Sequence, residues 1–395
     1  MINKFDIWKE CPKVPLPSVL LTVVDNRGKT VPTAPSGHKL IATNCVRNEN
    51  LYPVYEKIRY LSEETYRTWF RAHPEPGDII FVCKGTPGRV CLVPDPIDFC
   101  IAQDMVALRA DPKIVYNKYL LAVLRSFQIQ EQILSTSVGD VIPHFKKSFF
   151  DQIMIPIPNM DIQKSIGDFY YTISEKTELN KKINDNLEQQ AAALFSSLYN
   201  RSNTEVRYTD LIQILGGGTP KTGETAYWNG NIAFFTPKDV GTPYTFITEK
   251  TITEEGLSHC NSRLYPVNTV FVTARGTVGK VGLSGVPMAM NQSCYALVGK
   301  ETHQLLVYFY TLKVVDKLKH KASGAVFDAI TTRDFESEQI MKLSDDDARA
   351  FLCVAEPMFQ DILNNSIENL RLSTLRDFLL PKLMSGEIDV SNIQF

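Results

Sequence analysis

Residues 344–388 carry one continuous helical pattern. Ser344 is a candidate N-cap, and the three aspartates after it place negative charge where the helix dipole favours it. We expect Gly386 to end the helix, and Pro357 either to kink it or to mark its true start. Apolar residues recur at roughly helical spacing along the stretch, at Phe351, Ala355, Phe359, Ile362, Ile367, Leu370, Leu375, Leu379 and Leu383.

Residues 161–199 have the same character. Both stretches are rich in asparagine near their centres, and each has one apolar face. Two such helices can bury these faces on each other as an antiparallel coiled coil. The alternative is two unrelated helices in the cores of two domains. The apolar face of this stretch consists of Ile162, Ile166, Phe169, Ile173, Ile183, Leu187, Ala191, Leu194 and Leu198.

An internal repeat favours the paired arrangement. The blocks FVC and GTPGRV at residues 81–90 match FVT and GTVGKV at residues 271–281, with one extra residue between the blocks of the second copy. The shift is about 190 residues, and a two-fold repeat in one chain indicates pseudo-two-fold symmetry in space. Further matches follow in the same order: Gln103 with Gln292, Leu108 with Leu297, Tyr119 with Tyr308, and Ile153-Met154 with Ile340-Met341.

The segments outside the long helices show mixed α and β patterns, so we expect an α+β fold. Short apolar runs broken by Pro and Gly turns predict strands in the first half. Residues 60–71 predict a short amphipathic helix with Ser62 as its N-cap, and residues 118–126 predict another. Residues 143–158 form a connector rich in prolines. The predicted strands lie at residues 19–24, 39–42, 78–82 and 90–93.

Length and composition indicate a protein of two or three domains that has 395 residues and a formal net charge of −2. The non-helical blocks are mildly basic and the long helices acidic, so the helices are poor candidates for lying on phosphates. We expect no signal peptide and no membrane span. The eight cysteines form no CxxC pair and no zinc spacing, which is typical of reduced, cytoplasmic proteins.

One glycine-rich segment of the chain is similar to a phosphate-binding loop. Residues 216–223 (GGGTPKTG) are followed by Glu224 where that motif needs lysine. We therefore expect a glycine-rich, basic loop whose backbone approaches DNA.

A second segment of the chain is similar to a nuclease motif. Pro94-Asp95 followed by Asp111-Pro112-Lys113 matches a metal-chelating carboxylate pattern, but the second half has no counterpart, which favours solvated loop charges. Neither a GxSxG motif nor an Asn-Pro-Pro-aromatic motif occurs, and the six histidines are scattered. The chain therefore has no evident catalytic centre, metal site or cofactor of its own.

The repeated turns at residues 85–89 and 276–280 carry glycine, threonine and a basic residue in both copies. They are either ordinary turns with solvated charges or turns whose amides, hydroxyl and cation meet phosphates or base edges. We favour contact of these turns with DNA. Asn44 and Lys238, which follow matched strands in the two halves, indicate a second contact loop. The candidate DNA-binding residues are Asn44, Lys84, Thr86, Arg89, Gln103, Thr219, Lys221, Lys238, Arg275, Thr277, Lys280 and Gln292.

Four segments of the sequence are distinctive when taken together: residues 215–228 (LGGGTPKTGETAYW), 236–240 (TPKDV), 187–198 (LEQQAAALFSSL) and 375–390 (LRDFLLPKLMSGEIDV). With these segments the chain resembles the specificity subunits of type I restriction–modification enzymes over essentially its whole length. The first half departs from the family pattern because it lacks a GGTP-type opening.

This resemblance implies a non-catalytic, prokaryotic reader of double-stranded DNA. Target-recognition domains at residues 1–158 and 201–343 would each read half of a bipartite, asymmetric site. Helices at residues 159–200 and 344–395 would set the spacer and dock methyltransferase subunits, expected to number two. Restriction subunits would supply translocation and cleavage. The alternatives are a self-contained nuclease or methyltransferase, and a scaffold that binds no DNA.

Overall fold

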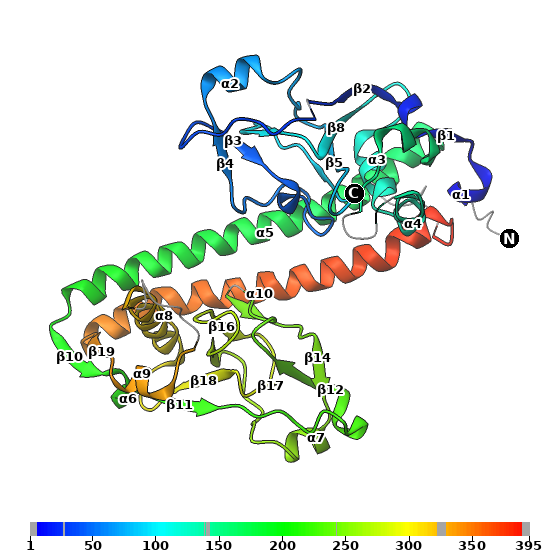
Figure 1. Cartoon of the computed structure of the whole chain (residues 1–395). Helices are drawn as coiled ribbons and strands as arrows, with labels where there is room; N and C mark the ends of the chain where they lie inside the picture. The colour runs from blue at the N-terminus through cyan, green and yellow to red at the C-terminus, as the bar shows by residue number, and fades with distance from the viewer. Residues whose placement is uncertain are drawn as a thin grey trace. The chain divides into compact units, whose positions relative to one another are not determined.

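The computed structural model describes residues 6–26, 28–137, 139, 143–241, 243–321 and 329–388. The chain divides into two compact units (Figure 1). The first unit is Met1–Asn180 with Glu368–Phe395, and the second is Lys181–Ile367. The predicted four-way division into domains and spacer helices stays a prediction, because these units divide both long helices.

The first unit contains two sheets, of strand order β2–β8–β5–β6 and β4–β3–β7. The first sheet is antiparallel, whereas β3 pairs antiparallel with β4 and parallel with β7. A two-stranded antiparallel ribbon, β1–β9, pairs a strand near the N-terminus with the strand that precedes the first long helix. The strands are β1 (Lys13–Pro15), β2 (Leu20–Val24), β3 (His38–Ile41), β4 (Arg59–Leu61), β5 (Ile79–Val82), β6 (Val90–Leu92), β7 (Phe99–Ile101), β8 (Met105–Ala110) and β9 (Met154–Pro156).

The second unit repeats this plan with strand orders β11–β18–β15–β16–β13 and β14–β12–β17. Here too the middle strand of the three, β12, pairs antiparallel with one neighbour and parallel with the other. The ribbon β10–β19 corresponds to β1–β9. The strands are β10 (Thr204–Arg207), β11 (Ile212–Gly216), β12 (Trp228–Phe235), β13 (Tyr244–Thr245), β14 (Lys250–Ile252), β15 (Val270–Thr273), β16 (Val281–Ser284), β17 (Met288–Met290), β18 (Cys294–Gly299) and β19 (Gln339–Lys342).

Short helices complete both units. The first unit has α1 (Ile7–Glu10), α2 (Glu63–Thr68), α3 (Asn117–Leu124) and α4 (Phe127–Thr136), with 3-10 turns at Leu16–Val19, Thr43–Cys45 and Lys147–Gln152. The second has α6 (Tyr208–Leu211), α7 (Glu254–Ser258), α8 (Gln304–Lys321) and α9 (Thr332–Glu336), with a 3-10 turn at Thr225–Tyr227.

The central strand of each unit is buried on both faces, which explains its continuous apolar run. In β5, Ile79 and Phe81 pack toward the helices, whereas Ile80 and Val82 pack toward the second sheet. In β15, Val270 and Val272 take the helix side. The two-fold sequence repeat is therefore confirmed as a repeat of topology and core.

The predicted alignment of the two copies is wrong by one residue at this strand. Phe81 pairs with Val90, and Val272 pairs with Val281, the counterpart of Val90. The structural counterpart of Phe81 is therefore Val272 and not Phe271. The two phenylalanines face opposite sides of their sheets, because Phe271 packs with the second sheet. The extra residue that the sequence comparison introduced is not needed.

Both long helices are confirmed as α5 (Met160–Arg201) and α10 (Asp345–Met384). Ser344 caps α10 by accepting a hydrogen bond from the Asp347 amide at 3.1 Å. The helix runs continuously through Pro357, which therefore does not mark its start. It ends before Gly386, whose φ of 68° is a left-handed conformation suited to glycine, and not at residue 388.

The two long helices are antiparallel within each unit. In the first unit, Phe169 and Ile173 cluster with Leu383, and Asn180 donates to Asn369 at 2.9 Å. Higher numbers on α5 thus meet lower numbers on α10. In the second unit, Asn365 donates to Asn184 at 2.9 Å, and the rings of Phe195 and Phe351 lie 5.4 Å apart.

The other predicted elements agree with the structure apart from one boundary. All four predicted strands are present, as β2, β3, β5 and β6, and the helix predicted at residues 118–126 is α3. The helix predicted at residues 60–71 begins only at Glu63, after its N-cap Ser62. Tyr60 lies instead in β4, because its carbonyl accepts a hydrogen bond from Ala34 and its strand pairs with β3.

All eight cysteines are free thiols, and six of them are buried. Among the described residues, no group of His, Cys, Asp and Glu is placed to hold a metal ion. No helix in the described part of the chain combines the length and apolar character that crossing a membrane requires.

Phe351 provides a test of the helix seam. It is fully buried on α10 against Phe195 and Phe309, so Phe351→Ala should leave a cavity and lower the free energy of unfolding by about 3–5 kcal/mol. Denaturant unfolding of the full chain measures this loss. Val354→Ala is the control, because this side chain is 43% exposed on the same helix. Equal effects of the two substitutions would contradict a seam built on Phe351.

Candidate nucleic-acid interface

The β15–β16 hairpin presents the predicted cations of the second unit. Its turn is closed by a hydrogen bond from the Thr273 amide to the Lys280 carbonyl at 2.9 Å and another from the Gly279 amide to the Thr273 carbonyl at 2.9 Å. The buried Thr273 hydroxyl also accepts from the Lys280 amide at 3.0 Å. The turn is therefore held from inside, while Arg275, Thr277 and Lys280 are exposed on it.

Two glycines give this turn its shape. Gly276 has a φ of +80° and Gly279 a φ of +73°, conformations that side chains rarely adopt. A Cβ on Gly276 would meet only Pro237, at 3.8 Å, so the backbone there is open to a ligand.

Hydrogen bonds join this turn to the neighbouring predicted contact loops. The Thr277 hydroxyl donates to the Pro237 carbonyl at 3.0 Å, which brings the turn to the loop that carries Lys238. The Arg275 amide donates to the Ser293 carbonyl at 3.3 Å, next to Gln292. Gln292 in turn accepts from the Thr219 hydroxyl. These contacts bring Thr219, Lys238, Arg275, Thr277 and Gln292 together at one edge of the unit.

Lys238 lies on an ordered loop and remains largely exposed. The Asp239 carboxylate accepts from the amides of Thr236 at 2.8 Å and Glu249 at 2.7 Å, which fixes the loop. Lys238 pairs with Glu249 at 3.4 Å, but its side chain is 78% exposed. Such surface pairs contribute little, so Lys238 can exchange this partner for a phosphate.

Two glycines of the glycine-rich loop pack closely against the protein itself. A Cβ on Gly217 would lie 2.1 Å from the Asn291 carbonyl oxygen, and one on Gly218 would lie 2.6 Å from the Asn261 amide nitrogen. This packing requires glycine at both positions, and contact of the loop with DNA stays a prediction. Lys221 is exposed at the far end of the loop, where its carbonyl accepts from the Trp228 indole at 3.3 Å.

In the first unit, an asparagine lies at the position of Gly217. Asn26 follows β2 at the place that Gly217 occupies after β11, given the matched pairings with β8 and β18. Its buried side chain donates to the Ile101 carbonyl at 3.1 Å and accepts from the Arg71 amide at 3.0 Å. An asparagine with paired side-chain atoms therefore stands where the GGTP-type opening has its second-unit glycine.

The β5–β6 hairpin of the first unit is closed in the same way as its counterpart. The Val82 amide donates to the Arg89 carbonyl at 2.9 Å, and the Gly88 amide to the Val82 carbonyl at 3.0 Å. Lys84 is exposed, whereas Thr86 and Arg89 are half-buried. Gly85 has a φ of +86° and open space around it, as Gly276 does.

Two further predicted residues lie beside this hairpin. Gln103 precedes Asp104, whose carbonyl accepts a hydrogen bond from the Cys83 amide at 2.8 Å. The Oε1 atom of Gln103 is buried and has no hydrogen-bond partner among the described residues. Asn44 donates to the Glu56 carbonyl at 3.1 Å, so its amide nitrogen is engaged within the protein. Its loop reaches the base of the hairpin through Asn48, which accepts from the Val90 amide at 2.8 Å.

Arg125 is a positioning residue that the sequence pattern did not indicate. From the end of α3 it donates to the carbonyls of Asn50 at 2.5 Å and Val90 at 2.7 Å, and to the Tyr170 hydroxyl of α5 at 2.9 Å. It thus ties the base of the β5–β6 hairpin to the long helix. In the second unit, Tyr308 of α8 instead donates to Glu188 of α5 at 2.9 Å, and burial raises the pKa of Glu188.

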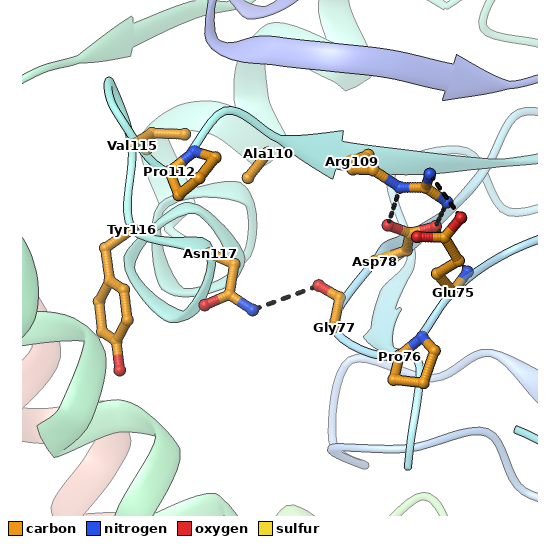
Figure 2. A pocket seen from close by; sticks show the side chains of 10 residues that line it. All are labelled: Glu75, Pro76, Gly77, Asp78, Arg109, Ala110, Pro112, Val115, Tyr116 and Asn117. Carbon is orange, nitrogen blue, oxygen red and sulfur yellow. Dashed lines mark hydrogen bonds and ion pairs between the residues drawn. The ribbon is translucent and has the colours of Figure 1, made fainter. Parts of the chain in front are cut away.

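The carboxylates of the nuclease-like pattern do not form a reactive site. Asp111 accepts from the Lys113 amide at 3.0 Å, as in an ordinary turn. The adjacent cavity, of about 330 Å³, is shown in Figure 2. Its Arg109 is held by both oxygens of Asp78, at 2.9 and 3.0 Å, and by Glu75 at 2.8 Å. Both lining carboxylates are therefore paired with one guanidinium, whose pKa is raised by Asp78.

The chain thus contains two copies of one mixed α and β plan, each of which carries basic residues on a hairpin. Residues 34–189 and 200–342 each match the type I restriction modification DNA specificity domain. These matches cover more than half of the chain, and the chain belongs to this family. It is accordingly a DNA-specificity component of type I restriction–modification and not itself an enzyme.

Individual relatives agree. The chain is 23% identical to the type I restriction enzyme HindI specificity subunit of Haemophilus influenzae, over 79% of this chain and 86% of the relative. It is 28% identical to the MjaIX specificity subunit of Methanocaldococcus jannaschii, over 40% of this chain and 37% of that one. A crystal structure of the S subunit of a type I system from M. genitalium shares the fold, with a TM-score of 0.60 at 17% identity over 97% of this chain and 99% of that one.

Substitution of Arg125 tests its positioning role. Arg125→Met should lower the free energy of unfolding by about 1.5–3 kcal/mol or more, because the partly buried carbonyls of Asn50 and Val90 lose a charged donor. Denaturant unfolding measures the loss. Arg67→Met removes an exposed i,i+4 pair on α2 and should cost no more than about 0.5 kcal/mol. A loss no larger for Arg125→Met than for this control would show that Arg125 does not hold the hairpin.

Proposed function

We propose that this chain reads a bipartite site in double-stranded DNA, with one half-site bound by each hairpin and its neighbouring loops. The observation that carries the proposal is the duplication of the contact surface. Both units close a hairpin with the same backbone hydrogen bonds and place an open, positive-φ glycine and basic residues on it. Because the loops of the two units differ in sequence, the two half-sites differ, and the site is asymmetric.

The cations on these hairpins suit the two levels of DNA recognition. Lysine and arginine that meet phosphates give affinity and register, whereas an arginine or amide that meets a base edge gives sequence information. Arg275 and Gln292 are the second unit's candidates for base contact, and Arg89 and Gln103 the first unit's. Lys84, Lys238 and Lys280 are the candidates for phosphate contact.

The long helices have the second role in the proposal. They set the number of unread base pairs between the half-sites and carry the docking surfaces for methyltransferase subunits, two of which would serve the two half-sites. Restriction subunits complete the nuclease assembly in the cytoplasm. The chain would supply sequence choice and spacing, and its partners would supply methyl transfer, translocation and cleavage.

Exchange of one reading unit tests this division of labour. Replacing residues 201–343 by the corresponding segment of a relative should change one half of the methylated motif and leave the other half and the spacer unchanged. The measurement is genome-wide mapping of methylated bases in a host that expresses the chain with its methyltransferase subunit.

The reciprocal exchange of residues 1–158 is the matched control and should change only the other half. If either exchange altered both halves of the motif, the units would not read independently, and the proposed function would fail.

A further inference from the structure

Lys319, near the end of α8, lies directly against the turn of the second unit's hairpin. A Cβ on Gly279 would lie 2.6 Å from the Lys319 Cε and 3.4 Å from its Nζ, and 3.1 Å from a methyl group of Val315. The lysine side chain therefore passes over the turn at Gly279, where no side chain of the turn blocks it. Lys319 itself is exposed to solvent.

In the part of the chain that the structure describes, the cations around this turn have no acidic partner. Other charged residues at the end of α8 have partners: Lys317 pairs with the buried Glu338 at 3.0 Å, Lys321 also pairs with Glu338, and His320 pairs with Asp316 at 3.6 Å. Within the described ranges, Lys319, Lys280 and Arg275 form no ion pair with a carboxylate. Like charges gathered on one turn without a counter-charge favour binding of an anion.

The first unit is neutral at the corresponding place. A Cβ on Gly88 would meet Ile133 at 3.0 Å and the Oε1 of Gln130 at 3.2 Å, both on α4. The Gln130 amide donates to the Gly88 carbonyl at 2.9 Å and so only supports the turn. The two hairpins share their backbone hydrogen bonds but differ in the side chain that lies over this glycine, a lysine in the second unit and a glutamine in the first.

We propose that Lys319 binds a DNA phosphate beside Lys280, across the Gly279 turn, and gives the second half-site one phosphate contact more than the first. The inference rests on the proposed function, because it assumes that the hairpins face DNA. A lysine ammonium is a point charge suited to phosphate, and such a contact adds affinity without sequence information. It would anchor the second unit more firmly and with a stronger dependence on salt.

The test is the salt dependence of binding by the full chain to a labelled duplex of mixed sequence, about 40 base pairs long, between about 50 and 200 mM salt. Lys319→Gln should reduce the slope of log K against log salt by about 0.9, so that affinity falls about threefold less over this range. Lys319→Arg keeps the charge and should keep the slope.

Lys9→Gln is the matched control, because it removes the same formal charge from an exposed side chain on α1. An equal change in Lys9→Gln and Lys319→Gln would reduce the effect to net charge and overturn the inference.

The double variant Arg275→Ala with Lys280→Ala separates the inference from the proposed function. If this variant lowers the slope and Lys319→Gln does not, the hairpin meets DNA without Lys319, and only the inference fails. If none of these variants changes binding, the hairpin does not face DNA, and the proposed function fails with it.

Discussion

The structure depends on the burial of an apolar stripe of α5 against an apolar stripe of α10. In the second unit this seam is aromatic: the rings of Phe195, Phe309 and Phe351 contact one another, and Phe359 contacts Phe309. The same cluster continues into β15 and β18, so the sheet and both long helices share one core. In the first unit, α10 contributes Leu380 and Met384 to the core of the sheet. Neither sheet can therefore be displaced from the helices without opening its own core.

The centres of the two helices are polar, and this gives the seam its alignment. In the first unit, Asn180 is fully buried and donates to Glu368 at 2.6 Å as well as to Asn369, which lowers the pKa of Glu368. In the second unit, Asn184 is bonded to Ser366 and Asn365. An unpaired buried N–H is costly, and the observed register pairs the side-chain amide nitrogens of Asn180 and Asn184 across the seam. Among the described residues, Oδ1 of Asn180 has no hydrogen-bond partner. Polar residues inside a coiled coil specify register at a cost in stability.

The sequence alone predicted the long helices, the cap at Ser344 and the repeated hairpins, because these depend on local spacing and turn chemistry. It misplaced Phe271 by one residue, since a run buried on both faces carries no alternation to fix its phase. It did not show that Gly217 and Gly218 pack closely against Asn291 and Asn261, because these residues are distant in sequence. Arg125 and Lys319 were missed for the same reason: their partners come together only in the folded chain.

The central claim is that α5 and α10 set the spacing between two half-sites. It is tested most directly by inserting four helix-forming residues between Asn180 and Lys181 and four between Ile367 and Glu368, where one unit ends and the other begins. The contacts within each unit would remain, and each helix would lengthen by about 6 Å, close to two base pairs of rise. The methylated motif of the lengthened chain should keep both halves and gain about two base pairs of spacer. An unchanged spacer with methylation retained would contradict the account.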